Sequence, residues 1–180
     1  MLMRLIVIRH ARTETNEKEI INGQSDESIS ESGRREVPAL VKKLQAYQFE
    51  VIYSSPLKRA LETARPIAES HKVDIDIDRR LIEVNMGSFT NKSFESTFEE
   101  LGMRSSDLLN TYAYDLRPHG GESAEEVHHR ISSFLSDLKS SKHSSVLVVA
   151  HGGVIRWFYY LCKGEKIGRS PNLGIHTFEI

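Results

Sequence analysis

The chain has 180 residues, of which 39% are hydrophobic and 27% charged, and its formal net charge is −1. These values predict a single soluble globular domain with a proper core, and a charge this close to zero argues against a nucleic-acid partner. The single cysteine, Cys162, excludes an internal disulfide, and no apolar run reaches the length of a signal peptide or a membrane span. We therefore expect a cytoplasmic protein that does not bind a membrane.

The first predicted element is a strand at residues 5–8, followed at once by Arg9 and His10. Four apolar β-formers in a row are typical of a central parallel strand that is buried on both faces. Ligands of open α/β sheets bind beyond the carboxyl ends of the strands. Arginine matches phosphate or carboxylate, and a neutral imidazole can attack phosphorus or take up a proton. We therefore expect His10 to be a nucleophile in a phosphate pocket.

Helices and strands are predicted to alternate through residues 30–77. Before them, Asn22-Gly23 favours a turn. Pro56 suits the first turn of the second helix, which Ser54 or Ser55 can cap, and Pro66 is expected to kink or break that helix. The helices are expected at about 30–47 and 57–68, and the strands at 51–53 and 74–77, the latter near a sheet edge.

The second half of the chain continues the alternation. Residues 93–117 are predicted to be helical in two pieces split around Gly102, and Ser123 with Glu126 forms a capping box that opens a further helix. A buried strand at 146–150, a helix at 154–162 and a final strand at 175–180 follow. The prediction is one domain over residues 1–180, a three-layer α/β/α fold with a mostly parallel central sheet, in which residues 84–120 cover a pocket.

Three of the predicted strands end in residues suited to bind an anion. One runs into Arg9-His10, another into His151, and a third into Ser54-Ser55-Pro56 with Arg59 one turn into the next helix. If these strands are neighbours, two arginines and two histidines meet at helix N-termini, where backbone N–H groups also favour negative charge. A phosphoryl group, with three oxygens and about two charges, matches such a cluster.

The stretch Arg9-His10-Ala11-Arg12-Thr13-Glu14-Thr15-Asn16 resembles the Arg-His-Gly-x-Thr-x-x-Asn signature of the histidine phosphatase superfamily, whose fold is phosphoglycerate mutase-like. Further blocks resemble those of the family in the same order and span almost the whole chain. They are Ser54 to Ala64, Leu81-Ile82-Glu83 with Gly87, Gly121-Glu122-Ser123, and Ala150-His151-Gly152-Gly153.

The resemblance implies a phosphatase that acts on small phosphate esters through a phosphohistidine at His10. It implies that Arg9, Arg59 and His151 bind the phosphoryl oxygens and that Glu83 donates a proton to the leaving oxygen. Nearby arginines also lower the pKa of His10 and stabilise charge in the transition state. Because a carboxylic acid can supply the proton, no metal and no cofactor are required. The implied substrate-binding residues are Asn16, Asn22, Gly23 and Gly152.

The chain departs from the family pattern at several positions. Ala11 and Asn91 stand where many members have glycine. A cofactor-dependent phosphoglycerate mutase has a tyrosine at the position of Met86 and an Arg-Arg pair in an insertion, and no such pair occurs between residues 90 and 118. Phosphatase is therefore favoured over mutase. A non-catalytic phospho-ligand-binding protein is a second alternative, against which His10 and Glu83 argue.

The remaining clusters are interpreted without a catalytic role. His128 and His129 point about 100° apart on a helix, so they are surface residues and no metal ligands. The basic runs, including residues 163–169, are expected to be solvated, and the aromatic residues 157–160 to be core and helix surface. A small homodimer contact there is left open. The natural substrate cannot be read from the sequence. Sugar phosphates, phosphoglycerates, nucleotide-derived phosphates and phosphoproteins all remain candidates.

Overall fold

A computed structural model describes residues 2–102 and 112–180. In this part of the chain, one sheet has the strand order β3-β2-β4-β1-β5. β5 runs antiparallel to β1, and the other neighbours are parallel. The predicted mostly parallel sheet is therefore confirmed. The strands are β1 (Arg4–Arg9), β2 (Ile52–Ser54), β3 (Ile75–Ile77), β4 (Ser145–Ala150) and β5 (Ile175–Glu179).

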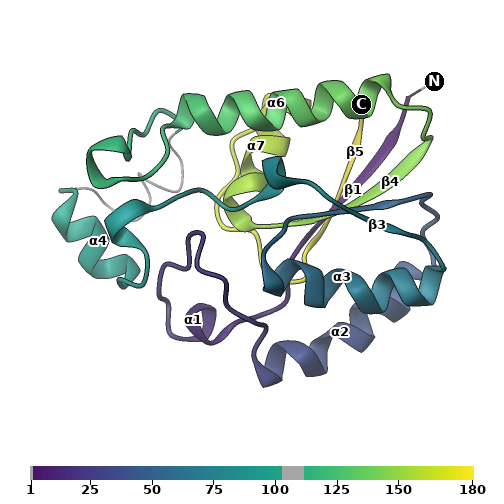
Figure 1. Ribbon diagram of the computed structural model, residues 1–180, viewed down its shortest axis with the longest axis horizontal. Coiled ribbons are helices and arrows are strands. Elements are labelled where there is room, and N and C mark those ends of the chain that lie inside the picture. The colour runs from purple at the N-terminus through teal and green to yellow at the C-terminus, as the bar shows by residue number, and fades with distance from the viewer. Residues whose placement is uncertain (1, 103–111) are drawn as a thin grey trace.

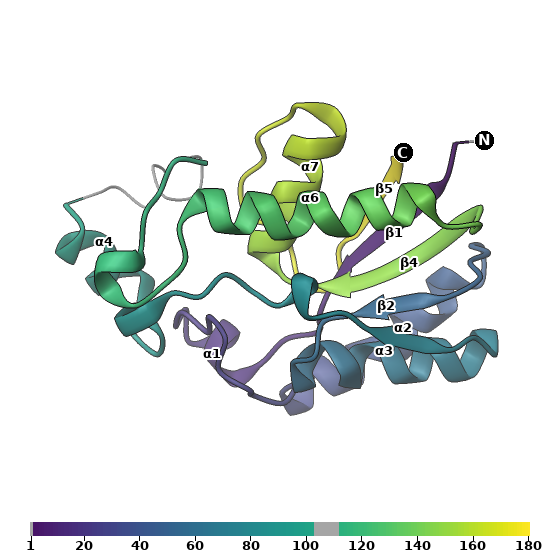
Figure 2. The same ribbon diagram turned by 45° about the horizontal axis from the view of Figure 1, so that its top comes forward.

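Helices cover both faces of the sheet. Figures 1 and 2 show α2 (Glu31–Leu44) and α3 (Lys58–His71) on one face, and α6 (Ala124–Ser140) and α7 (Gly152–Lys163) on the other. Side chains alternate along β1, so Leu5 and Val7 pack with the α6 and α7 residues, whereas Ile6 and Ile8 pack with those of α2 and α3. This two-sided burial explains why the strand is a continuous apolar run.

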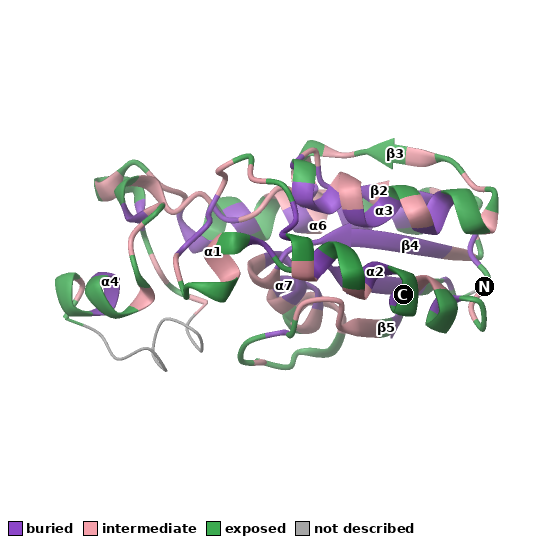
Figure 3. Cartoon of the chain, turned by 90° about the horizontal axis from the view of Figure 1, so that it is seen from below, coloured by how far each residue is buried: buried purple, intermediate pink, exposed green. Residues whose placement is uncertain are grey.

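The remaining elements lie mostly beyond the sheet rather than on its faces. In Figure 1, α1 (Glu14–Glu17) and α4 (Phe94–Glu100) lie beyond one end of the sheet, away from the N-terminus. An isolated β-bridge between Ile20 and Ser93 joins the segment that follows α1 to the start of α4. In Figure 3, β4 is buried along most of its length and α4 is largely exposed. Short 3-10 helices span Arg79–Leu81, Gly87–Phe89 and Arg117–His119.

Two helices of the sheet layers begin with side-chain caps, and one of these caps was predicted. Ser30 caps α2 through the N–H of Gly33, and Ser123 and Glu126 form the predicted capping box of α6. Of the two helical pieces expected over residues 93–117, α4 is present. The second piece falls largely on residues 103–111, outside the described part of the chain, and its prediction is wrong for residues 112–116, which are not helical.

The start of α3 differs from the prediction. The helix begins at Lys58, with Leu57 at the N-cap and without a side-chain cap. The serine hydroxyls are used elsewhere: Ser54 donates to the carbonyl of Ser55, and Ser55 is hydrogen-bonded to His151. The helix also continues through Pro66, where we predicted a kink or a break. Its buried face holds it together there, because Ala64 and Ile67 are fully buried beside the proline.

Candidate active site

The site lies at the carboxyl ends of three neighbouring strands. His10, Ser55 and His151 each directly follow a strand, β1, β2 and β4 respectively. The N–H of His10 donates to the carbonyl of Ala150 at 3.0 Å, which extends the pairing of β1 with β4 by one residue. The ring centroids of His10 and His151 are 5.1 Å apart. The order of the strands therefore brings the two histidines together, as predicted.

His10 is buried and held in one tautomer. Its Nδ1 donates to the carbonyl of Ala11 at 2.7 Å, and because a carbonyl can only accept, the proton lies on Nδ1 and the lone pair on Nε2. Burial, followed by the charges of Arg59 and Arg9, holds the pKa of His10 well below its ordinary value. At neutral pH the ring is therefore uncharged, with Nε2 available as a nucleophile.

Two buried guanidinium groups provide the positive charge. Arg59 donates to the carbonyls of Ser25 and Gly23 at 2.6 and 2.7 Å, and Arg9 donates to the carbonyl of Ser170. These bonds hold both side chains in place. Burial lowers the pKa of Arg9 to about 10, which leaves the group charged at neutral pH. Within the described residues, Nε of Arg9 and Nε of Arg59 are buried without a hydrogen-bond partner.

His151 adds a third buried nitrogen of this kind. Its Nε2 is 2.7 Å from the hydroxyl oxygen of Ser55, and its Nδ1 is buried with no partner in the part of the chain that is described. Burial and the charge of Arg59 lower the pKa of His151 well below its ordinary value. Buried polar groups are nearly always paired, so the unsatisfied nitrogens around His10 indicate a place for an anion.

Glu83 is held at the N-terminus of α7. Its carboxylate accepts from the N–H of Val84 at 2.8 Å and from the N–H of Gly153 at 3.2 Å. A Cβ on Gly153 would lie only 2.4 Å from Oε1 of Glu83, so a glycine is required for this approach. The carboxylate thus shares one cavity with His10.

The four residues expected to bind substrate all line this cavity. Asn16 accepts from Nδ2 of Asn172, which also donates to the carbonyl of His10, both at 3.0 Å. The amide nitrogen of Asn22 donates within its own loop, to Thr13 and Glu27. Gly23 has a φ of +51°, which favours glycine, and Gly152 begins α7. Asn22 therefore fixes the loop in which the carbonyl of Gly23 accepts a hydrogen bond from Arg59.

The cavity has a volume of about 660 Å³. Part of its wall comes from the predicted covering segment at 84–120. Other parts come from residues after α1, from α7 and from the loop between α7 and β5. The apolar and aromatic lining residues are Ile20, Ile21, Val84, Met86, Phe94, Phe98, Tyr112, Tyr114, Leu116 and Trp157.

The loop between α7 and β5 supplies residues that sequence reasoning missed. Arg169 is exposed, as expected, but it also lines the cavity and lies 3.7 Å from Glu19, which was not predicted. Ser170 accepts from Arg9, and Asn172 binds the carbonyl of His10. No local pattern marks these residues, because the antiparallel pairing of β5 with β1 brings their loop to the site.

The structure accommodates both replacements of family glycines. Ala11 is buried against Ile29 and Val37, and its N–H donates to the hydroxyl of Thr63 at 3.0 Å. Asn91 has a φ of +68°, in the left-handed region that asparagine tolerates better than most residues. The conformation suited to glycine is thus retained at Asn91.

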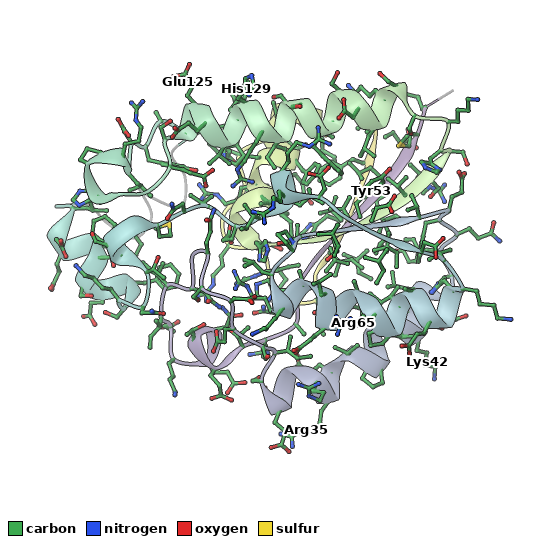
Figure 4. The ribbon with its side chains drawn as sticks, in the orientation of Figure 1. Arg35, Lys42, Tyr53, Arg65, Glu125 and His129 are labelled. Carbon is green, nitrogen blue, oxygen red and sulfur yellow. The ribbon has the colours of Figure 1, made fainter. Side chains whose placement is uncertain are left out.

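The other sequence clusters are the histidines and the basic runs, which are expected to be solvated surface residues. Residues 2–102 and 112–180 contain no group of three or more potential metal ligands. Figure 4 shows His129 pointing outward from α6 and Arg35 pointing away from α2, as expected for solvated residues. No helix in the same described ranges is long and apolar enough to cross a membrane.

Comparison with known proteins agrees with the motifs and the geometry. The family model described as "Histidine phosphatase superfamily (branch 1)" matches residues 5–180. The chain belongs to the histidine phosphatase superfamily. The family predicted from the five motifs is therefore confirmed.

Curated and solved members of this superfamily are similar over most of the chain. Phosphoserine phosphatase 1 of Hydrogenobacter thermophilus is 30% identical, over 96% of this chain and 82% of its own length. Phosphoglycerate mutase-like protein 4 of Arabidopsis thaliana is 28% identical, over 98% and 79%. The structure of mycobacterial glucosyl-3-phosphoglycerate phosphatase with VO3 superposes with a TM-score of 0.88 at 27% identity, covering 97% of this chain and 92% of that one. The phosphoglycerate mutase-like fold is thus confirmed.

Proposed function

We propose that this protein is a phosphatase that hydrolyses phosphate monoesters through a phosphohistidine at His10. The observation that carries this proposal is a neutral, buried His10 with its Nε2 lone pair free, beside Arg9, Arg59 and His151. Two positive charges and buried unpaired nitrogens suit the dianionic phosphoryl group. The similarity to proteins named as phosphatases supports the same reaction class.

The proposed reaction has two displacements at phosphorus. First, Nε2 of His10 forms a bond to phosphorus while the bond to the ester oxygen breaks, and the acid form of Glu83 gives its proton to the departing alcohol. Water then attacks the phosphohistidine, Glu83 takes up a proton from that water, and the bond from Nε2 to phosphorus breaks. Inorganic phosphate leaves, and both residues return to their starting states. Arg9 and Arg59 stabilise the charge on the phosphoryl oxygens in both steps.

A mutase is less favoured than a phosphatase. A mutase has to retain a bisphosphate while it reorients, and the chain has no Arg-Arg pair between residues 90 and 118 that would help to hold it. Met86, in the place of the family tyrosine, lines the cavity. A protein that only binds phosphate needs neither a nucleophile nor an acid, whereas His10 and Glu83 share one cavity here.

Turnover of p-nitrophenyl phosphate by the wild-type protein and by His10→Ala tests the nucleophile. We expect the substitution to lower kcat by more than about 1,000-fold, because no other group replaces the covalent path. In a rapid quench with a labelled ester, acid-labile phosphate should appear on residue 10. Activity that persists in His10→Ala would refute the assignment.

A second assay separates phosphatase from mutase. The protein is given 3-phosphoglycerate together with 2,3-bisphosphoglycerate, and released phosphate and 2-phosphoglycerate are both measured. We expect no 2-phosphoglycerate. Its formation without release of phosphate would establish the mutase instead.

A further inference from the structure

The cavity is much larger than the phosphoryl group requires. Its volume of about 660 Å³ lies within the range of roughly 300–1,000 Å³ for sites that enclose drug-sized ligands. The groups that suit phosphate, the charged Arg9 and Arg59 and the neutral His10, occupy only part of the lining. The rest of the space is therefore available to the alcohol of the ester.

The described residues that face this space are mostly apolar, and half of these apolar side chains are aromatic. Phe94 and Phe98 of α4 stack with ring centroids 6.1 Å apart, and Tyr112 meets Trp157 edge-on at 5.1 Å. Met86 adds a flexible apolar side chain to the same lining. Rings that already pack against one another lose little freedom when a further ring is added, so the wall is suited to an aromatic guest.

The charged residues of the wall disfavour an acidic guest. Glu19, Glu95 and Glu99 line the cavity along with Arg156 and Arg169. Arg169 lies 3.7 Å from Glu19 and 5.4 Å from the ring centre of Phe94, and Arg156 lies 5.3 Å from that of Tyr112. Three glutamates and two arginines line this wall, so a carboxylate on the alcohol would meet more negative than positive groups there. Repulsion between the glutamates and a second carboxylate thus disfavours an ester whose alcohol is acidic.

We propose that the preferred substrate is the phosphate monoester of a bulky, aromatic alcohol that carries no carboxylate. This inference rests on the proposed phosphatase function and names the substrate class of the same site. The phosphoryl group sits at His10, and the alcohol packs against Phe94, Phe98 and Trp157. Burying one aromatic side group of the alcohol is expected to give a roughly 10- to 150-fold preference.

The test compares esters whose leaving groups are all primary alcohols, so that leaving-group reactivity does not decide the outcome. The substrates are 2-(1-naphthyl)ethyl phosphate, O-phospho-L-serine and 3-phosphoglycerate, with p-nitrophenyl phosphate as a general reporter of phosphatase activity. We expect kcat/KM to be at least about tenfold higher for the naphthyl ester than for either acidic ester.

Variants of α4 locate the source of the preference. Phe94→Ala should lower kcat/KM at least fivefold more for the naphthyl ester than for phosphoserine. Glu95→Gln combined with Glu99→Gln should raise kcat/KM for 3-phosphoglycerate. Glu100→Gln is the matched control, because Glu100 lies on the same helix, pairs with Lys92 and is not among the residues that line the cavity within the described chain. This control should change neither the relative kcat/KM for the naphthyl ester and phosphoserine nor the kcat/KM for 3-phosphoglycerate.

The outcomes separate the two proposals. Equal rates for all three esters, or a preference for phosphoserine or 3-phosphoglycerate, would overturn the inference about the alcohol and leave the phosphatase function standing. No hydrolysis of any ester, p-nitrophenyl phosphate included, would overturn the phosphatase function and the inference with it.

Discussion

Glu83 depends on the absence of a side chain at residue 153. A Cβ on residue 153 would lie only 2.4 Å from Oε1 of Glu83, and Oε2 of Glu83 accepts from the N–H of Gly153. Glu83 therefore has to move if residue 153 gains a methyl group. A displaced acid no longer reaches the leaving oxygen, and general acid catalysis typically contributes 10²- to 10⁴-fold.

Gly153→Ala is therefore expected to lower kcat by about 100-fold for an ester of a poor leaving group such as a primary alcohol. The loss should be much smaller for p-nitrophenyl phosphate, which leaves without a proton. Gly168→Ala is the control, because a Cβ there meets no atom within 4 Å among the described residues. Equal losses on both esters would show that Glu83 is not the proton donor.

The residues of the site differ in how far the sequence predicts them. His10 and His151 directly follow buried apolar strands, so the topology of a parallel sheet places them together. Arg59 follows from its position in the helix after β2, where it lies in the first turn. Arg169 is brought in by a loop whose path depends on β5, and it carries no local signal. Residues that directly follow strands are thus predictable from the sequence, and those on long loops are not.

At the scale of elements, the capping box of α6 offers a direct test of a sequence signal. The hydroxyl of Ser123 accepts from the N–H of Glu126, and the carboxylate of Glu126 accepts from the N–H of Ser123. Ser123→Ala is expected to lower the free energy of unfolding by about 1 kcal/mol. Chemical denaturation measures the change.

Ser136→Ala on the same helix is the matched control. Ser136 is exposed, and alanine is the better helix former, so the free energy of unfolding should stay the same or rise slightly. A similar loss of stability in both variants would mean that the capping box contributes nothing.

Where the prediction of elements was wrong, competing interactions are the cause. Ser54 ends β2 and Ser55 follows it in a pattern that favours capping, but Ser54 donates to the carbonyl of Ser55. Ser55 is hydrogen-bonded to His151 and accepts from the N–H of Leu57, the N-cap residue, rather than from an N–H within the helix. Pro66 removes one backbone hydrogen bond, and the buried face of α3 compensates for it. Capping by a serine and helix breaking by a proline are local preferences, and tertiary contacts that cannot be read from the sequence decide their outcome.

At the scale of the whole molecule, two buried histidines make stability depend on pH. Both His10 and His151 have pKa values well below the ordinary value of 6.5, mainly because of burial. Below pH 6.5 the unfolded chain therefore binds protons that the folded chain does not, and stability falls as pH falls. Above that pH the two histidines are unprotonated in both the folded and the unfolded chain, so they do not make stability depend on pH.

We expect the free energy of unfolding to fall by about 1 kcal/mol per pH unit for each of these histidines below pH 6. Urea denaturation at pH 7.5 and at pH 5.5 measures this. His10→Gln should reduce the loss, whereas His129→Gln, at an exposed position on α6, should not. An identical loss in the wild-type protein and in His10→Gln would contradict the assignment.

The fold itself was readable from the alternation of strands and helices, since that pattern leaves few topologies. The single domain over residues 1–180 and the absence of a nucleic-acid partner remain predictions, and so do two further predictions about the whole molecule. One is a cytoplasmic location, and the other is a homodimer through residues 157–160. Trp157 and Phe158 are buried and Tyr160 is 38% exposed, so Tyr160 offers more surface to a partner than they do. Analytical ultracentrifugation would measure the mass in solution.

The neighbours of β1 in the sheet are made long after β1 itself. In the sheet described here, the strand lies between β4 and β5, which are residues 145–150 and 175–179. During translation, the apolar run at 5–8 therefore emerges from the ribosome more than a hundred residues before any strand can pair with it. A nascent chain in this state exposes an apolar strand without its partners and is prone to aggregate, and a chain truncated before residue 145 holds His10 but lacks His151 and cannot assemble the pocket.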